Sequence, residues 1–213
     1  MNPYLVQFLD LKEQHEYDNS LYNWWGKCKI TGKDFCECSY TIRRELCNKY
    51  SFAIPNDEAI EKIASFGKIL EIGAGTGYWA NLISAAGAEV GAIDLAPVGG
   101  PWVNEWAFKE KHYPVTQGNG WEWVDVLTPE YTLMMCWPPM DNMAADCLNS
   151  THGDRVIYIG EWDGCTANGT FFDMVDGWWN EDDQTFAKWK IEEQISIPHW
   201  PMIHDSMYIL KRK

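Results

Sequence analysis

The chain of 213 residues is long enough for one domain with a full core, and its 46% apolar content excludes a mainly disordered protein. The formal charge of −14 disfavours nucleic acid as a partner without excluding it, because nucleic-acid binders usually carry a basic surface. No apolar run approaches the ~20 residues of a membrane span, and the N-terminus lacks a signal-peptide pattern. The sequence therefore predicts a cytoplasmic protein without a membrane partner, and it predicts nothing about oligomeric state.

Residues 1–55 are predicted to form a helical N-terminal extension, and residues 56–213 the main domain. The aromatic segment LYNWW and the segment SYTIRRELCNKY lie in this extension, and Pro55 ends the pattern. Trp24 and Trp25 are candidates for a lid over a binding site in the main domain.

Four of the seven cysteines lie in the extension, at positions 28, 36, 38 and 47. Their spacing, C-x7-C-x-C-x8-C, is not that of a zinc ribbon or zinc finger. An odd number of cysteines without a signal peptide favours reduced thiols. We therefore expect no bound metal.

The main domain is predicted to begin with a helix in the segment NDEAIEKIASFG. Asn56 can cap this helix, the acidic residues that follow suit its positive end, and Gly67 can close it. Apolar residues at helical spacing give the helix a buried face.

Strands and helices are then expected to alternate. The predicted strands are residues 68–72, 89–94, 113–117, 131–137, 155–160, 186–197 and 205–212, and the predicted helices are residues 78–87, 141–150 and 168–179. This alternation predicts a doubly wound, mostly parallel, seven-stranded α/β sheet. The last two strands have no helix between them, so we expect them to pair antiparallel.

The first of these strands leads into a glycine-rich turn in the segment ILEIGAGTGYWA. Gly73, Gly75 and Gly77 allow the backbone to approach a ligand closely, although such a turn can also exist without a ligand. A dinucleotide-binding turn reads G-x-G-x-x-G, and here Tyr78 occupies the place of the third glycine. The turn therefore disfavours a nicotinamide-dependent oxidoreductase.

The pattern E-x-G-x-G-x-G after a strand, with an acidic residue ending the next strand, resembles the class I S-adenosylmethionine-dependent methyltransferases, which have a Rossmann-like fold. The resemblance is specific only from Ile69 to Asp94. It implies S-adenosyl-L-methionine as cofactor, with Glu71 near its amino-acid end and Asp94 at the ribose hydroxyls, which a carboxylate can hold with two oxygens. The residues that we expect at the cofactor are Glu71, Gly73, Ala74, Gly75, Gly77, Tyr78, Asp94 and Leu95.

The fourth predicted strand ends in the segment MMCWPPM, where members of this superfamily place a loop that faces the methyl acceptor. Members that methylate amines of nucleic-acid bases carry there a polar residue, two prolines and an aromatic residue. This chain has Trp137, Pro138, Pro139 and Met140, so the polar residue and the trailing aromatic are absent. The Pro138 carbonyl can still accept a hydrogen bond from an amine; alternatively, the prolines only end the strand.

Several tryptophans follow or end the predicted strands, namely Trp79, Trp102, Trp121, Trp123, Trp137 and Trp162. Because ligands of parallel α/β sheets bind outside the carboxyl ends of the strands, we expect most of these residues to line the binding site, the alternative being ordinary packing. Acidic residues are expected at the same edge, at Asp141, Asp146, Glu161 and Asp163. An aromatic and acidic pocket favours a planar or cationic ligand.

The sequence thus predicts a methyltransferase that acts by in-line transfer on a small aromatic or amine-bearing molecule or on a protein side chain. Trp137 and Pro138 are expected beside the acceptor, and Glu161 is the candidate base, unless its carboxylate only caps the following turn. Two alternatives remain: a non-catalytic cofactor-binding module that acts through partners, and methylation of a nucleic-acid base amine.

Overall fold

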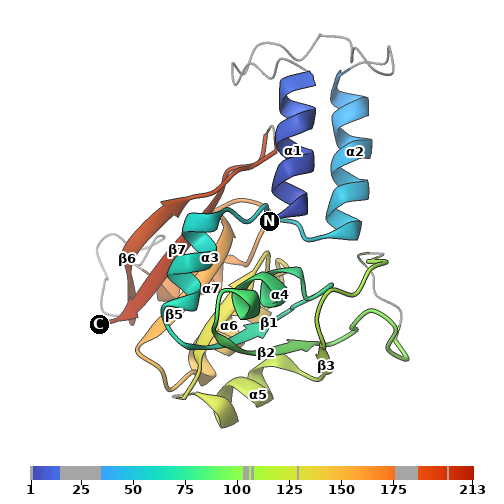
Figure 1. The fold of residues 1–213 in the computed structure, drawn as a ribbon. Coiled ribbons are helices and arrows are strands. Elements are labelled where there is room, and N and C mark those ends of the chain that lie inside the picture. The colour runs from blue at the N-terminus through green and yellow to red at the C-terminus, as the bar shows by residue number, and fades with distance from the viewer. Residues whose placement is uncertain are drawn as a thin grey trace.

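The computed structural model describes residues 2–14, 35–102, 106, 108–128, 130–175, 187–200 and 202–213. Within these residues, one seven-stranded sheet has helices on both faces, and a pair of helices projects beyond it (Figure 1). The strands are β1 (Lys68–Ile72), β2 (Glu89–Asp94), β3 (Thr116–Gln117), β4 (Thr132–Cys136), β5 (Arg155–Glu161), β6 (Trp189–Ser196) and β7 (Asp205–Arg212). Their order in the sheet is β3-β2-β1-β4-β5-β7-β6.

The first five strands run parallel, and β7 lies antiparallel between β5 and β6. This arrangement is a Rossmann-like α/β fold, and it confirms the predicted sheet with its antiparallel last pair. The sequence indicated that the last two strands pair, but it gave no signal that the second of them would be the inner one.

The two faces of the sheet follow from the alternation of side chains along each strand. One face packs against α3 (Asp57–Ala64) and α4 (Tyr78–Ala85), and the other packs against α5 (Gly120–Leu127), α6 (Met143–Ser150) and α7 (Gly169–Met174). In β1, for example, Ile69 lies on the face covered by α3 and α4, whereas Leu70 and Ile72 lie on the face covered by α5, α6 and α7.

Asparagine caps fix the start of two helices. The side-chain oxygen of Asn56 accepts the amide of Ala59 at 3.0 Å at the start of α3, as predicted. Asn168 accepts the amide of Phe171 at 3.0 Å at the start of α7. The predicted helix at residues 168–179 ends early, at Met174, and residues 176–179 lie outside the described residues.

The connection between β3 and β4 differs from the prediction. No helix was expected there, yet α5 occupies residues 120–127, and β3 is shorter than the predicted strand at residues 113–117. Glycines, tryptophans and β-branched residues have modest helix propensity, which hid this helix from local analysis. Val124 is fully buried against the sheet, so tertiary packing rather than propensity stabilises α5.

The described part of the N-terminal extension is helical, as predicted. It consists of α1 (Pro3–Gln14) and α2 (Phe35–Lys49), which lie side by side in Figure 1 and share an apolar cluster. Trp24, Trp25 and the proposed lid lie outside the described residues. The division into two domains stays a prediction, although the extension is bonded to the main domain: the Tyr78 hydroxyl donates to Asn2 Oδ1 at 2.7 Å.

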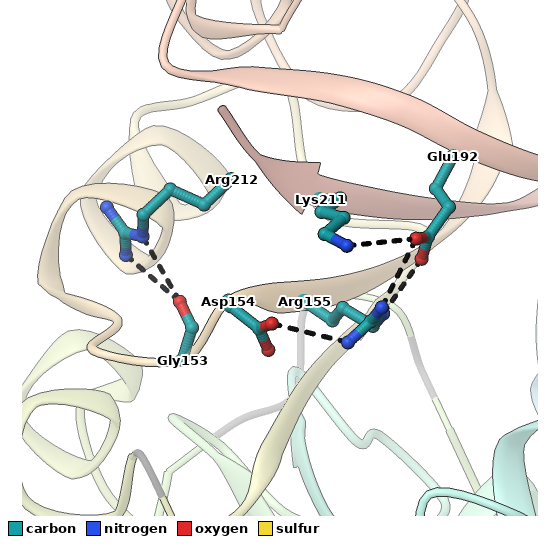
Figure 2. A network of polar contacts seen from close by, with 6 residues as sticks. All are labelled: Gly153, Asp154, Arg155, Glu192, Lys211 and Arg212. Atoms are coloured by element: carbon teal, nitrogen blue, oxygen red, sulfur yellow. Dashed lines mark hydrogen bonds and ion pairs between the residues drawn. The ribbon is translucent and has the colours of Figure 1, made fainter.

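A polar network closes the end of the sheet where β5 begins and β7 ends (Figure 2). Arg155 Nε donates to Glu192 at 2.8 Å, and Lys211 Nζ lies 3.5 Å from the same carboxylate. Arg212 donates to the carbonyls of Thr151 at 2.6 Å and Gly153 at 3.1 Å.

The guanidinium of Arg212 also lies 4.5 Å from the ring centroid of Trp189. Arg212 therefore connects the end of β7 both to the loop after α6 and to the edge strand β6.

None of the helices within the described ranges has the length and apolar character that a membrane span requires.

Candidate functional site

A cavity of about 790 Å³ lies where β1, β2 and β4 end, with Ile72, Asp94 and Cys136 in its wall. This is the edge at which open α/β sheets bind ligands, and the volume is in the range of small-molecule sites. Of the residues predicted at the cofactor, all except Gly77 line the cavity.

The glycine turn adopts a conformation that requires glycine. Gly73, Gly75 and Gly77 have φ values of 75°, 53° and 72°, which other residues adopt only with strain. A Cβ on Gly75 would also lie 2.6 Å from Cε2 of Phe108. Gly77 stands behind the cavity as the N-cap of α4, so its contribution is to the turn itself.

Asp94 connects the end of β2 to this turn. One carboxylate oxygen accepts the amide of Gly75 at 2.8 Å, and the other accepts the amide of Ala96 at 2.8 Å. Each oxygen retains a lone pair for a further hydrogen bond. The carboxylate is thus held in a fixed position in the cavity wall and can still receive two donors from a ligand.

Glu71 is the most unusual polar group of the cavity. The residue is 2% exposed, and its Oε2 has no hydrogen-bond partner among the residues that the structure describes. Burial raises the pKa of Glu71 to about 8, although the amide of Ala80 lowers it; the nearby Asp94 raises it further. An unpartnered buried oxygen is costly, so the site favours a ligand that brings a hydrogen-bond donor, above all a cationic one.

The cavity wall is acidic and aromatic. Among the described residues that line it, no lysine, arginine or histidine occurs, whereas four carboxylates do: Glu71, Asp94, Asp141 and Asp146. Its aromatic residues are Tyr50, Phe52, Tyr78, Trp79, Trp102, Trp106, Phe108, Trp121 and Trp137. No group of three or more described side chains is arranged to hold a metal ion.

The tryptophans divide between the cavity and the core. Trp79, Trp102, Trp121 and Trp137 line the cavity, as the sequence predicted. Trp123 and Trp162 do not line it. They pack against the apolar cluster on the face of the sheet that α5, α6 and α7 cover.

An aromatic cluster centred on Phe52 was not predicted from the sequence. The ring of Phe52 stacks on Trp137 with centroids 5.0 Å apart, and it meets Trp106 and Phe108 at 5.6 Å each. These residues come from three irregular segments, and none of the segments has a periodicity that predicts the contact. All four rings of the cluster line the cavity.

Two hydrogen bonds fix the backbone segment that leads to Phe52. The Thr76 hydroxyl donates to the carbonyl of Tyr50, and His112 Nε2 donates to the carbonyl of Lys49 at 2.7 Å. The ring of Tyr50 packs on Tyr78, with centroids 4.9 Å apart. The segment after α2 is therefore an integral wall of the cavity.

The three residues predicted at the acceptor have different positions. Trp137 lines the cavity, and its φ of 52° is unusual for a non-glycine residue. Pro138 does not line the cavity, and its carbonyl already accepts the amide of Ala167 at 2.9 Å. The predicted contact of Pro138 with an acceptor thus has no support in this geometry.

Glu161 also lies outside the cavity lining. Its two carboxylate oxygens accept the amides of Cys165 at 3.0 Å and His204 at 2.9 Å. This geometry favours the alternative in which the carboxylate caps the turn after β5. Its role as a base stays a prediction.

Comparison with known proteins gave matches only among solved structures, since no family model and no curated protein matches. Magnesium protoporphyrin IX methyltransferase from Synechocystis PCC 6803, with bound S-adenosylmethionine, is 12% identical, with 96% of this chain and 97% of that chain covered and a TM-score of 0.48. For mitomycin 7-O-methyltransferase the identity is 13%, the coverage 99% and 69%, and the TM-score 0.44. For a protein of the NADB-Rossmann superfamily from Streptococcus agalactiae the values are 11%, 76%, 71% and 0.42.

Methyltransferases are among the solved structures that resemble this chain. These identities and TM-scores are too low to assign a function. The assignment therefore depends on the residues of the cavity.

Proposed function

We propose that the cavity binds S-adenosyl-L-methionine and that the protein is a methyltransferase that uses it. The observation that carries this proposal is the convergence of three features on one cavity: the glycine turn, the fixed carboxylate of Asp94, and the buried Glu71, whose Oε2 has no partner among the described residues.

The charge of the cavity supports this cofactor over a dinucleotide. S-adenosylmethionine carries a sulfonium and an ammonium group and no phosphate, so it suits a wall with four carboxylates and no described cation. A nicotinamide dinucleotide would bring two negatively charged phosphates into the same wall. Tyr78, at the position of the third dinucleotide glycine, further disfavours that alternative.

Each part of the cofactor has a complementary group. Asp94, which lines the cavity, would accept hydrogen bonds from the two ribose hydroxyls, and Glu71 would accept the ammonium group of the methionine part. Leu95 and Trp121, which are 58% and 43% exposed, offer apolar surfaces for the adenine ring. The amides of the glycine turn are the donors for the cofactor carboxylate.

The acceptor enters on the side of the Phe52 cluster. The aromatic rings of this cluster suit a planar group, and the exposed carboxylates of Asp141 and Asp146, which also line the cavity, suit an amine. Such a group can belong to a small molecule or to a protein side chain. When bound, the cofactor would supply an electrophilic methyl group to a lone pair of the acceptor and would leave as the neutral thioether. The chain contributes by holding the two reactants in line while a proton leaves the acceptor to solvent.

Two alternative functions differ in their support. A base-amine acceptor requires polar contacts at the end of β4, but Pro138 does not line the cavity, and its carbonyl accepts the amide of Ala167. A binding module without catalysis would use the same cofactor site, so only turnover distinguishes it from an enzyme.

Calorimetric titration of the purified protein with S-adenosylmethionine and S-adenosylhomocysteine tests the cofactor assignment, with nicotinamide dinucleotide as the control. We expect both nucleosides to bind and the control not to bind. Absence of binding at millimolar nucleoside would refute the proposal.

Turnover is tested with methyl-labelled cofactor and fractionated cell extract. We expect label in an acceptor, and protease, nuclease and ultrafiltration identify whether it is protein, nucleic acid or a small molecule. Binding without label transfer to any fraction would favour the non-catalytic module.

A further inference from the structure

Asp205 is a buried carboxyl group that the proposed reaction does not use. It begins β7 and is 3% exposed. Its Oδ1 accepts the indole N–H of Trp137 at 2.8 Å, and its Oδ2 has no partner among the described residues. Asp205 does not line the cavity, whereas its hydrogen-bond partner Trp137 does.

Trp137 is a residue whose position needs support. It follows β4 with a φ of 52°, a conformation that costs free energy and persists only where surrounding contacts enforce it. Its amide donates to the carbonyl of Ile159 at 2.8 Å, and its ring stacks on Phe52. The bond from the indole N–H to Asp205 fixes the remaining freedom, which is the rotation of the ring.

The environment of Asp205 makes this bond sensitive to charge. Burial raises the pKa of Asp205 to about 7, the bond from Trp137 lowers it, Glu161 raises it, and Arg43 lowers it. A charge-assisted bond to an ionised carboxylate is about twice as strong as a bond to a neutral group. The titratable or charged groups that face Asp205 are Arg43 and Cys47 of α2, Cys136 of β4, Tyr158 and Glu161 of β5, and Tyr208 of β7.

We propose that Asp205 is a positioning residue for the acceptor: its carboxylate orients the Trp137 ring, and the ring in turn forms the acceptor side of the cavity wall. This inference rests on the proposed function, because it assigns the Phe52–Trp137 side of the cavity to the acceptor. Asp94 and Glu71, which we propose at the cofactor, are not members of this contact.

The contact is tested by heteronuclear NMR of the indole N–H groups, which needs no acceptor. The Trp137 signal is the one lost in Trp137→Phe. We expect it to shift with pH, with a midpoint near neutrality, and to lose this shift in Asp205→Asn. The matched control, Glu192→Gln, lies at the other end of the sheet and should keep it.

A pH-independent Trp137 signal in the wild-type protein would overturn the proposal, as would a shift that persists in Asp205→Asn. The wild-type titration decides the matter even if the Asn variant does not fold.

The positioning role is tested by steady-state kinetics with the labelled acceptor. In Asp205→Asn we expect the affinity for S-adenosylhomocysteine to stay within a factor of two of wild type. We expect kcat/KM for the acceptor to fall about tenfold above neutral pH, where the wild-type carboxylate is ionised, and its pH dependence to flatten.

Equal loss of nucleoside affinity and turnover would show a general structural defect and contradict the positioning role. If the wild-type protein binds no nucleoside, the proposed function fails, whereas the NMR titration still reports on the contact itself.

Discussion

The two ends of the sheet differ in how completely their buried and charged groups are paired. At the end where β5 begins and β7 ends, Arg155 and Lys211 are paired with the carboxylate of Glu192, and Arg212 is paired with backbone carbonyls. At the cavity end, one buried oxygen each of Glu71 and Asp205 has no hydrogen-bond partner in the described part of the chain, and neither does the indole N–H of Trp79. The paired end has one exception of this kind, the indole N–H of Trp189, which lies under the guanidinium of Arg212.

This contrast indicates where the chain gives up stability. Unpartnered buried polar groups and a non-glycine residue at positive φ destabilise a fold, and natural proteins tend to keep such features at functional sites. A ligand that brings a hydrogen-bond donor to Glu71 would satisfy its unpartnered oxygen and stabilise the folded protein. Variants at the cavity end should therefore change ligand affinity, and variants at the other end should change stability alone.

The largest effect is expected from Gly75→Ala. The new Cβ would lie 2.6 Å from Phe108 in a backbone conformation that disfavours alanine, so we expect affinity for S-adenosylhomocysteine to fall at least about 100-fold. The control is Gly87→Ala, which also has positive φ but has no atom within 4 Å of the new Cβ. It should lower the free energy of unfolding by about 1–2 kcal/mol and leave affinity intact. Equal affinities in the two variants, measured by calorimetry, would refute the assigned cofactor turn.

A smaller effect is expected from Glu71→Gln, which removes the charge that would pair with the cofactor ammonium. Loss of a charged hydrogen bond of about 1.5–3 kcal/mol predicts affinity about 10–100-fold weaker. At neutral pH the free carboxyl is mostly protonated, since its pKa is about 8, and pairing with the ammonium ionises it. Calorimetry in buffers of different ionisation enthalpy should show a proton released by the wild type and none by the variant.

The same residue makes a prediction about stability without ligand. Because the pKa of Glu71 is higher in the folded protein than in the unfolded chain, its contribution to stability is complete at low pH and is lost as pH rises toward about 8. Glu71→Gln should reduce this loss in denaturant titrations across that range. An unchanged pH dependence would contradict the raised pKa.

The smallest effect on ligand binding is expected at the other end of the sheet. Arg212→Met leaves the carbonyls of Thr151 and Gly153 without their donor, and should lower the free energy of unfolding by about 1–3 kcal/mol. Lys211→Met removes only an exposed ion pair and serves as the milder control. Neither variant should change nucleoside affinity, and a change in either would break the separation between the two ends.

The sequence predicted the parts of the fold that depend on local patterns. Alternating strands and helices, the cap at Asn56 and the glycine turn each carry their signal within a few neighbouring residues. Helix α5 escaped prediction because burial of Val124, rather than helix propensity, stabilises it.

The acceptor side of the site was less predictable for a similar reason. Phe52, Trp106 and Phe108 come together only through tertiary contacts between segments that are distant in sequence. A carboxylate at the end of a strand is visible in the sequence, but its hydrogen bonds are not. Glu161 was therefore a reasonable candidate base, although its two oxygens accept backbone amides, whereas Asp205 gave no signal at all.

The bonds that join Thr76 to Tyr50 and Tyr78 to Asn2 have one more consequence. They connect the segments that flank α1 and α2 directly to the glycine turn and the start of α4. If an antibody or other binder that grips α1 and α2 alters nucleoside affinity by some factor, thermodynamic reciprocity requires the nucleoside to alter the grip of that binder by the same factor.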